Sequence, residues 1–451
     1  MDILGLLPQF GGLIWTILAF VVALSVIVAI HEYGHYIVGR WTGIKADVFS
    51  LGFGPVLWSG TDRRGTRWQV AALPFGGYVK FAGDSNAASG KDEVAMAAVA
   101  EHPEQLRHTM HGAPLWARAL TVAAGPAFNF ILSALVFFAM AFFIGVPREP
   151  LTVASFNALP QQQDYTLQPG DTVVAIDGVP VDQLSDPEVG TAFFEDLPAT
   201  PLMDYTVDRD GVESVVEGPN YAPPLVGRVM PTSAADEAGL RKGDVITAIE
   251  GEPVYSFNQL KSVVEASDGA PLVLDVWRDG TVDQFTFAAK VTDEQQADGS
   301  FSKQLRIGIV SGSAINPETE RRGFGEAIVA GVTGVWSIIT GSLSGLGSMI
   351  TGAISTCNMS GPIGIAQVSG SVASQGAVPF IEFIAVLSTA VGLLNLFPIP
   401  ALDGGHLVFY AYEAVTRRPP SDAVARVLMT IGLAMVLTLM VFALWNDLFC
   451  P

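Results

Sequence analysis

An uninterrupted apolar run from Leu13 to Ile30 leads directly into the motif His31-Glu32-x-x-His35, and this arrangement constrains the fold more than any other feature of the chain. About 20 apolar residues cross the ~30 Å hydrocarbon core of a bilayer, where the backbone must be paired within a helix. Helix positions four residues apart share one face, so His31 and His35 can bind one metal ion while Glu32 acts as a base on water. Alternatively, both histidines lie at a helix end and face solvent or a neighbouring helix.

Three further apolar runs are long enough to cross a membrane, near Ala119–Gly145, Pro379–Pro400 and Val427–Trp445. Only 15% of the 451 residues are charged and the mean hydropathy is +0.41, which is typical of an integral membrane protein and not of a soluble one with buried core helices. We therefore predict a polytopic α-helical membrane protein. Its four transmembrane helices are expected at about 13–35, 119–145, 379–402 and 427–446, within an N-terminal membrane part (1–145) and a C-terminal membrane part (378–451).

Charge placement orients these spans. The connection between the first two spans carries nine basic residues counting its flanks, whereas the two chain ends carry none. By the positive-inside rule, this connection and the short 403–426 connection are cytoplasmic, and both termini lie outside. The segment 146–325, with 29 acidic and 12 basic residues, is then extracytoplasmic. The net charge of −20 argues against nucleic-acid binding, and two cysteines cannot form a disulfide framework.

An internal repeat lies in the extracytoplasmic segment. Residues 167–181 align without gaps on residues 240–254, with a shared Gly-Asp and a shared acid-Gly pair. The pattern resembles the core of PDZ domains, with a tight hairpin turn at the acid-Gly pair. We predict two PDZ-like α/β domains, at about 150–221 and 222–311, which bind peptide or protein ends by strand addition or act as spacers with closed grooves.

Two other segments are assigned from pattern. Alternation and turn glycines predict strands over about 48–82, which form a membrane-associated β-hairpin or sheet on the cytoplasmic side. The segment 323–354 is apolar but rich in glycine and serine. If it crossed the membrane, Asp403 would lie on the opposite side from His31, so we assign 320–370 to an interfacial or re-entrant position.

A catalytic zinc site usually has three protein ligands, and the two motif histidines leave one position open. His102, His108 and His111 lie in a polar stretch typical of a surface. Asp403 is the better candidate because the predicted orientation brings it to the same side of the membrane as His31. Its alternative role is to cap a following helix, and His406 either reaches the metal or is structural.

The motifs together resemble the site-2 protease family of intramembrane zinc peptidases. The residues that carry this resemblance are His31-Glu32-x-x-His35, Gly125-Pro126-Ala-Phe-Asn129, Ser360-Gly361-Pro362-Ile-Gly364 and Asn395-x-x-Pro398-x-Pro400-x-Leu402-Asp403-Gly404-Gly405-His406. Four spans with two PDZ modules between the second and third resemble the RseP subgroup of Gram-negative bacteria. The resemblance implies one Zn²⁺ held by His31, His35 and Asp403, with Glu32 as the catalytic base.

The resemblance also implies substrates, partners and location. It implies cleavage of transmembrane segments in single-pass proteins: an anti-sigma factor first trimmed outside, whose release switches on an envelope-stress response, and remnant signal peptides. The location is then the inner membrane, with termini and PDZ domains periplasmic and the active site near the cytoplasmic side. The PDZ pair would screen out untrimmed substrates by size.

Substrate-binding residues are predicted from the same picture. Opening a helix in lipid leaves backbone groups unpaired, and an edge strand can replace the lost hydrogen bonds. We expect such an edge beside Phe53, Gly54, Gly76, Gly77 and Tyr78. Asn129 and Asn395 are assigned to substrate backbone or oxyanion binding, or alternatively to interhelical hydrogen bonds.

Two other functions fit parts of the sequence. A non-catalytic scaffold, or pseudoprotease, would bind envelope proteins through the PDZ modules, but it would not need intact His31, Glu32, His35 and Asp403. A metal transporter would carry more polar groups through its spans and no tandem peptide-binding modules.

Overall fold

The computed structural model describes residues 7–85, 90–160, 165–185, 187–295 and 301–449, and the chain divides into two compact units. The first unit comprises Met1–Ala139, Gly325–Ile350 and Thr356–Pro451, and the second comprises Met140–Phe324 and Thr351–Ser355. The two chain ends, whose side of the membrane is predicted above, lie outside the described residues.

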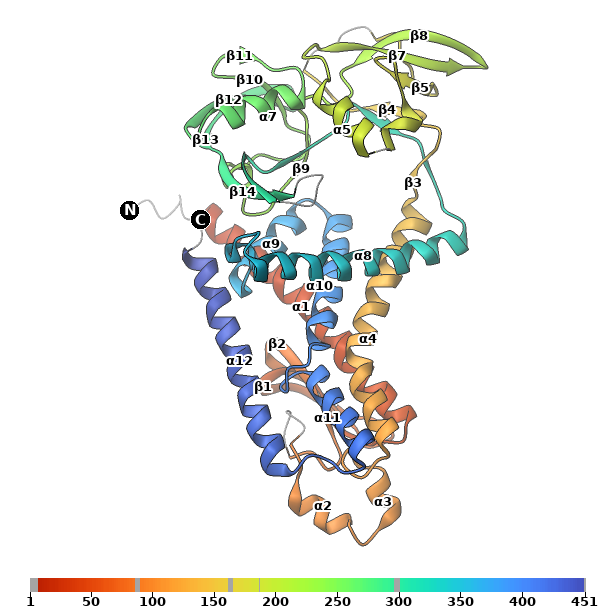
Figure 1. Ribbon diagram of the computed structural model, residues 1–451, viewed down its shortest axis with the longest axis vertical. Coiled ribbons are helices and arrows are strands. Elements are labelled where there is room, and N and C mark those ends of the chain that lie inside the picture. Colours follow the sequence, from red (N-terminus) through yellow and green to blue (C-terminus); the bar gives the residue numbers. More distant parts are fainter. Residues whose placement is uncertain (1–6, 86–89, 161–164, 186, 296–300, 450–451) are drawn as a thin grey trace. The chain divides into compact units, whose positions relative to one another are not determined.

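The first unit is built on long apolar helices (Figure 1). Within the described chain, five helices are long and apolar enough to cross a membrane: Gly12–Trp41, Leu115–Ile144, Phe324–Thr351, Ala377–Asn395 and Asp422–Phe449. They confirm a polytopic membrane protein. The helices of this part of the chain are α1 (Leu7–Trp41), α2 (Glu93–Val99), α3 (Pro103–Arg107), α4 (Leu115–Ala139) with the π turn η2 (Met140–Ile144), α8 (Phe324–Thr351), η4 (Thr356–Asn358), α9 (Pro362–Ser374), α10 (Ala377–Asn395), α11 (Asp403–Thr416) and α12 (Asp422–Phe449).

Helix α8 is the fifth apolar helix and falls in the segment predicted as interfacial or re-entrant. Figure 1 shows it crosswise to α4. The two helices approach closely at Gly331, since a Cβ added there would lie only 2.5 Å from the carbonyl oxygen of Ala134 on α4. Length and composition alone also allow α8 to span, so the count of four spans stays a prediction.

Helix α4 is the central helix of this unit and contacts α1, α10 and α11. Small residues permit this packing, as is usual where helices meet in a membrane. A Cβ at Gly34 of α1 would lie 2.5 Å from the Ala124 carbonyl oxygen, and one at Gly392 of α10 would lie 3.1 Å from the Pro126 carbonyl oxygen. The backbones of α1 and α10 therefore approach α4 directly.

The third predicted span ends earlier than expected. The prediction extended it to residue 402, but α10 ends at Asn395. Pro398 and Pro400 explain this, because proline lacks an N–H and disfavours the helical conformation of the residue before it. Asp403 therefore does not end span three but is the first residue of α11, preceded by Leu402 at the N-cap.

The predicted strands form one curled hairpin of β1 (Ala46–Thr61) and β2 (Arg67–Phe81). Leu51 of β1 pairs with Gly77 on one side and with Val70 on the other, so the two ends of β2 flank the first half of β1. Residues 77–80 of β2 pair with β1 alone among the described strands, which leaves their other side as a free edge.

The second unit contains two modules with the same sheet order, β6-β5-β7-β8 and β11-β10-β12-β13. The elements of the first are β4 (Val153–Phe156), β5 (Thr172–Ile176), β6 (Val179–Pro180), η3 (Val181–Ser185), α5 (Pro187–Glu195), β7 (Leu202–Arg209), β8 (Val212–Pro219) and β17 (Ile315–Pro317). Those of the second are β9 (Val226–Val229), α6 (Ala234–Ala238), β10 (Val245–Ile249), β11 (Glu252–Pro253), α7 (Phe257–Ala266), β12 (Pro271–Arg278), β13 (Thr281–Ala288), β14 (Lys290–Gln295), β15 (Phe301–Arg306) and β16 (Ile309–Ser311). A further strand pair, β3 (Val146–Pro147) with β18 (Thr319–Glu320), connects this unit to its neighbouring helices along the chain.

The predicted hairpin turns are confirmed. Asp177-Gly178 and Glu250-Gly251 all have positive φ, as a two-residue type I′ turn requires. One boundary differs from the prediction: β17 pairs with β4, and its Ile315 belongs to the first module's core. The first module is therefore completed by residues beyond the predicted 150–221 range, on the far side of the second module in sequence.

The aspartates of the two repeated Gly-Asp pairs are structural. Asp171 is buried and accepts two hydrogen bonds from Arg209, from Nε at 2.6 Å and from Nη2 at 2.7 Å. Asp244 is held in the same way by Arg278, at 2.7 Å for each bond. The Arg209 guanidinium holds the pKa of Asp171 below its usual value.

Candidate metal centre

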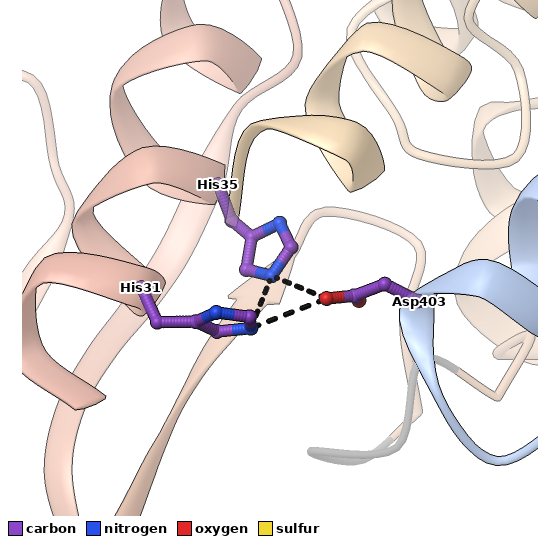
Figure 2. A group of neighbouring side chains, drawn as sticks. All are labelled: His31, His35 and Asp403. Carbon is purple, nitrogen blue, oxygen red and sulfur yellow. Dashed lines mark hydrogen bonds and ion pairs between the residues drawn. The ribbon is translucent and has the colours of Figure 1, made fainter. Parts of the chain in front are cut away.

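His31 and His35 lie one helical turn apart on α1 and point to the same place (Figure 2). Each is 9% exposed, and their Nε2 atoms are 3.2 Å apart. His35 Nδ1 donates a hydrogen bond of 2.8 Å to the carbonyl oxygen of Thr121 on α4. This fixes the proton on Nδ1 and leaves the lone pair on Nε2, which is the tautomer a metal ligand needs.

Asp403 reaches the same point from the start of α11 (Figure 2). Its Oδ2 lies 3.2 Å from His31 Nε2 and 3.5 Å from His35 Nε2. This buried oxygen has no hydrogen-bond partner among the described residues. The three ligand atoms lie within 4.8 Å of one another, so residues about 370 positions apart form one cluster.

The donor set fits zinc. Two imidazole nitrogens and one carboxylate oxygen are the usual protein ligands of a catalytic zinc ion, which keeps a further position open. The unpartnered Oδ2 of Asp403 supplies the negative charge that a cation would balance. Gly125 of α4 leaves the space that the two rings occupy, because a Cβ added there would lie 2.8 Å from His31 Nε2 and closer still to His35 Nε2.

Glu32 lies beside this cluster, held by the hairpin. Its carboxylate accepts a hydrogen bond from the backbone N–H of Val79 on β2. A Cβ added at the neighbouring Gly77 would lie 3.2 Å from Glu32 Cγ and 2.8 Å from the Ser50 carbonyl oxygen. The absence of a side chain at Gly77 therefore lets the strand approach Glu32 closely.

A cavity of ≈240 Å³ joins these groups. Besides His31, Glu32, His35 and Asp403, its lining includes Gly77, Tyr78, Asn395, His406 and Tyr410. Residues of α1, α4, α10, α11, α12 and the hairpin thus surround one small polar space.

The predicted substrate-binding residues separate into two groups. Gly77, Tyr78 and Asn395 line the cavity, whereas Phe53, Gly54 and Gly76 do not. Phe53 remains adjacent, because its ring stacks on that of Tyr78 with centroids 6.0 Å apart. Asn129 is fully buried, does not line the cavity, and has its Nδ2 3.2 Å from His31 Nδ1.

The contacts of Thr121, Gly125 and Val79 with the site were not predicted from the sequence. Thr121 and Val79 contribute only backbone atoms, for which no side-chain signal exists. Gly125 was noted within a motif, and a glycine beside a proline in an apolar run was the available signal for a close approach.

Two histidines outside the site, which were predicted to lie on the surface, each make a specific polar contact. His111 Nε2 lies 3.1 Å from Oδ1 of Asp84, a carboxyl whose pKa burial raises. His108 Nδ1 lies 2.5 Å from the carbonyl oxygen of Gly43. His111 thus contacts the turn that follows β2 and His108 the turn that follows α1, and neither belongs to the three-residue cluster.

Known proteins resemble this chain over nearly its whole length. Residues 19–439 match Peptidase family M50. A Rhizobium meliloti protein named "Putative zinc metalloprotease" is 36% identical over 435 residues, covering 96% of each chain. One of Agrobacterium fabrum with the same description is 36% identical over 442 residues, covering 97% of each. The "Regulator of sigma-E protease RseP" of Salmonella typhimurium is 32% identical over 464 residues, covering 97% of this chain and 99% of that one.

Proposed function

The chain belongs to Peptidase family M50 and is an integral membrane zinc metalloprotease of the site-2 type, and from this we propose that it cleaves transmembrane segments of single-pass proteins. One observation supports the proposal above the others. His31, His35 and Asp403 share a cavity with Glu32, and the apolar helices α1, α4, α10 and α12, each long enough to span a bilayer, contribute to its wall beside the hairpin and α11. A site in that wall is suited to a substrate helix within the membrane.

We assign the chemistry to these four residues. His31, His35 and Asp403 would hold the zinc ion, which when bound supplies Lewis acidity to a water molecule and to the scissile carbonyl. Glu32 takes a proton from the attacking water and returns it to the leaving amine. The Val79 N–H orients the Glu32 carboxylate for both transfers. Asn395 lines the cavity and is the side-chain amide suited to the substrate backbone or the developing oxyanion.

The free edge of β2 supports a way to open the substrate. A peptide bond within a helix is committed to an i to i−4 hydrogen bond, and breaking it in lipid costs several kcal/mol per unpaired group. Residues 77–80 pair on one side only among the described strands, and Gly77 and Tyr78 line the cavity. Because the Val79 N–H is already used by Glu32, we propose that the unwound substrate pairs with the other backbone groups of this edge, which replaces the lost bonds beside Glu32.

We also propose the orientation and location. The basic connections favour a cytoplasmic position for the hairpin side, and the acidic second unit is then periplasmic in a Gram-negative inner membrane. With α8 at the interface, four spans bring His31 and Asp403 to the same side.

For the substrate class we propose an anti-sigma factor trimmed outside, and remnant signal peptides. The name of the Salmonella relative, "Regulator of sigma-E protease RseP", supports a role in envelope-stress signalling. The two modules are proposed as PDZ-like domains that bind peptide ends or exclude bulky substrates. A cavity of ≈650 Å³ between α7 and residues 305–311, also lined by α5, is large enough for a peptide end.

The test uses the purified full-length chain in liposomes with a synthetic single-pass substrate, offered with and without a folded extracytoplasmic domain. Glu32→Gln should lower fragment yield by about 10²- to 10⁴-fold with zinc still bound, and a chelator should abolish cleavage of the wild type. Glu104→Gln, the same change at an exposed position of α3, is the matched control and should cleave normally. Equal yield from wild type and Glu32→Gln would refute the proposal and favour the scaffold alternative. Equal rates on both substrate forms would refute only the size filter.

A further inference from the structure

Asn129 of α4 lies directly behind His31. It is fully buried, its Nδ2 is 3.2 Å from His31 Nδ1, and its Oδ1 has no hydrogen-bond partner among the described residues. Because Asn129 does not line the cavity, it cannot touch a substrate held there.

The hydrogen bonds between α4 and α10 do not use the Asn129 side chain either. Two serines form the polar link between α4 and α10, and both use the backbone of Asn129. Ser388 Oγ donates to the Asn129 carbonyl oxygen at 3.1 Å, and Ser133 Oγ lies 3.0 Å from the same oxygen and 2.7 Å from the Ala385 carbonyl oxygen. The amide side chain is left to face His31.

The chemistry of His31 decides what that amide must do. A neutral imidazole that offers the Nε2 lone pair to a metal carries its proton on Nδ1. With the Asn129 NH₂ group opposite His31 Nδ1–H, two hydrogen-bond donors would face each other. Rotating the Asn129 carboxamide by half a turn puts its oxygen there instead, because nitrogen and oxygen then exchange places. The turned amide accepts a hydrogen bond from Nδ1–H through Oδ1, the atom that otherwise lacks a partner.

We propose that Asn129 is a positioning residue for His31: its amide oxygen accepts the Nδ1 proton and so fixes the ring in the metal-binding tautomer. The same helix face does the same for His35, through the carbonyl oxygen of Thr121. Thr121, Gly125 and Asn129 follow at intervals of four, which aligns an acceptor, a gap for both rings and a second acceptor along one face of α4.

The inference rests on the proposed role of His31 as a zinc ligand, so the test separates the two. Zinc affinity of the full-length protein in detergent is measured by competition with a fluorescent chelator, without substrate. Asn129→Leu, which keeps the shape and removes the acceptor, should weaken zinc binding by about 10- to 100-fold. Asn129→Asp keeps an acceptor of the same size and should bind zinc within a few-fold of wild type.

Two further arms complete the experiment. Ser133→Ala disturbs the same helix contact without touching His31 and should leave zinc affinity unchanged. His31→Ala should lose zinc outright; retained affinity there would overturn the proposed ligand set itself. If His31→Ala loses zinc but Asn129→Leu binds it as wild type does, the positioning role is wrong and the proposed function stands. If Asn129→Leu does not fold, equal weakening by Asn129→Asp and by Asn129→Ala would equally refute the acceptor role.

Discussion

Replacing Gly125 by alanine should remove zinc binding while leaving the helix bundle intact. A Cβ at this position would lie 2.5 Å from His35 Cε1 and 2.8 Å from His31 Nε2, whereas ordinary contact begins at 3.4 Å. To remove the overlap with His35, its ring or the α4 backbone must therefore move by at least ~0.9 Å, the difference between 3.4 and 2.5 Å. Metal–ligand distances tolerate only about 0.2 Å.

The size of the effect follows from that mismatch. Misplacing a catalytic group by about 1 Å costs on the order of 10²-fold in rate, and a displaced ligand costs zinc affinity as well. Alanine also favours a helix over glycine by up to about 1 kcal/mol. This gain offsets only part of the about 1–3 kcal/mol that overpacking of a buried site costs, so the metal-free variant should still fold but unfold at a somewhat lower temperature than the metal-free wild type, while its cleavage rate falls by at least about 100-fold.

The assays are chelator competition for zinc, fragment yield from a synthetic transmembrane substrate, and thermal unfolding in detergent. Gly341→Ala on α8 is the matched control, because a Cβ there meets nothing within 4 Å. It should leave zinc binding and cleavage unchanged. Full zinc affinity and activity in Gly125→Ala would show that the two histidines do not occupy the metal-binding positions described here, and would refute the reasoning.

Three further changes test other parts of the structure. Val79→Pro removes the N–H that orients Glu32 and should abolish cleavage with zinc retained; loss of zinc as well would contradict a role confined to Glu32 and the substrate. The pKa of Asp171 lies below its usual value, so its pairing with Arg209 should stabilise the second unit fully above the unfolded pKa of about 3.9 and progressively less as pH falls through the folded pKa. Asp171→Asn should therefore make thermal unfolding of this unit less dependent on pH. An unchanged pH profile in this variant would contradict the stabilising role of the pair. Glu413→Gln breaks the 2.6 Å ion pair with Arg118, both largely buried, and should destabilise the protein by about 2 kcal/mol; further loss on also replacing Arg118 by Met would contradict that account.

Local spacing and chain topology account for what the sequence predicts correctly. His31 and His35 are four residues apart on a helix, so their convergence needs no knowledge of the rest of the fold. The proximity of Asp403 to His31 was expected from the predicted membrane orientation, which puts both residues on one side. The end of α10 at Asn395 was also predictable from Pro398 and Pro400, although the prediction extended the span to 402.

Contacts that depend on which face a helix turns toward its neighbour could not be predicted from the sequence. An apolar helix such as α4 has no single apolar stripe in its sequence to show which face meets α1, so Thr121, Gly125 and Asn129 could not be assigned to one surface. The pairing of β17 with β4 is similarly invisible, because more than 150 residues separate partners whose short strands carry no distinctive pattern.

The polar atoms of the centre can lie among apolar helices because almost every one has its own partner. His35 Nδ1 is paired with the Thr121 carbonyl, His31 Nδ1 faces Asn129, and Glu32 accepts from Val79. The two Nε2 lone pairs and Oδ2 of Asp403 point at one another instead. A proton on either ring could satisfy one pair of these atoms but not all three, whereas a single cation contacts all three at once. Because the neighbouring polar atoms are already paired, the two Nε2 atoms and Asp403 Oδ2 favour a metal ion over a proton. Helix α4 provides most of these pairing groups but contributes no metal ligand itself.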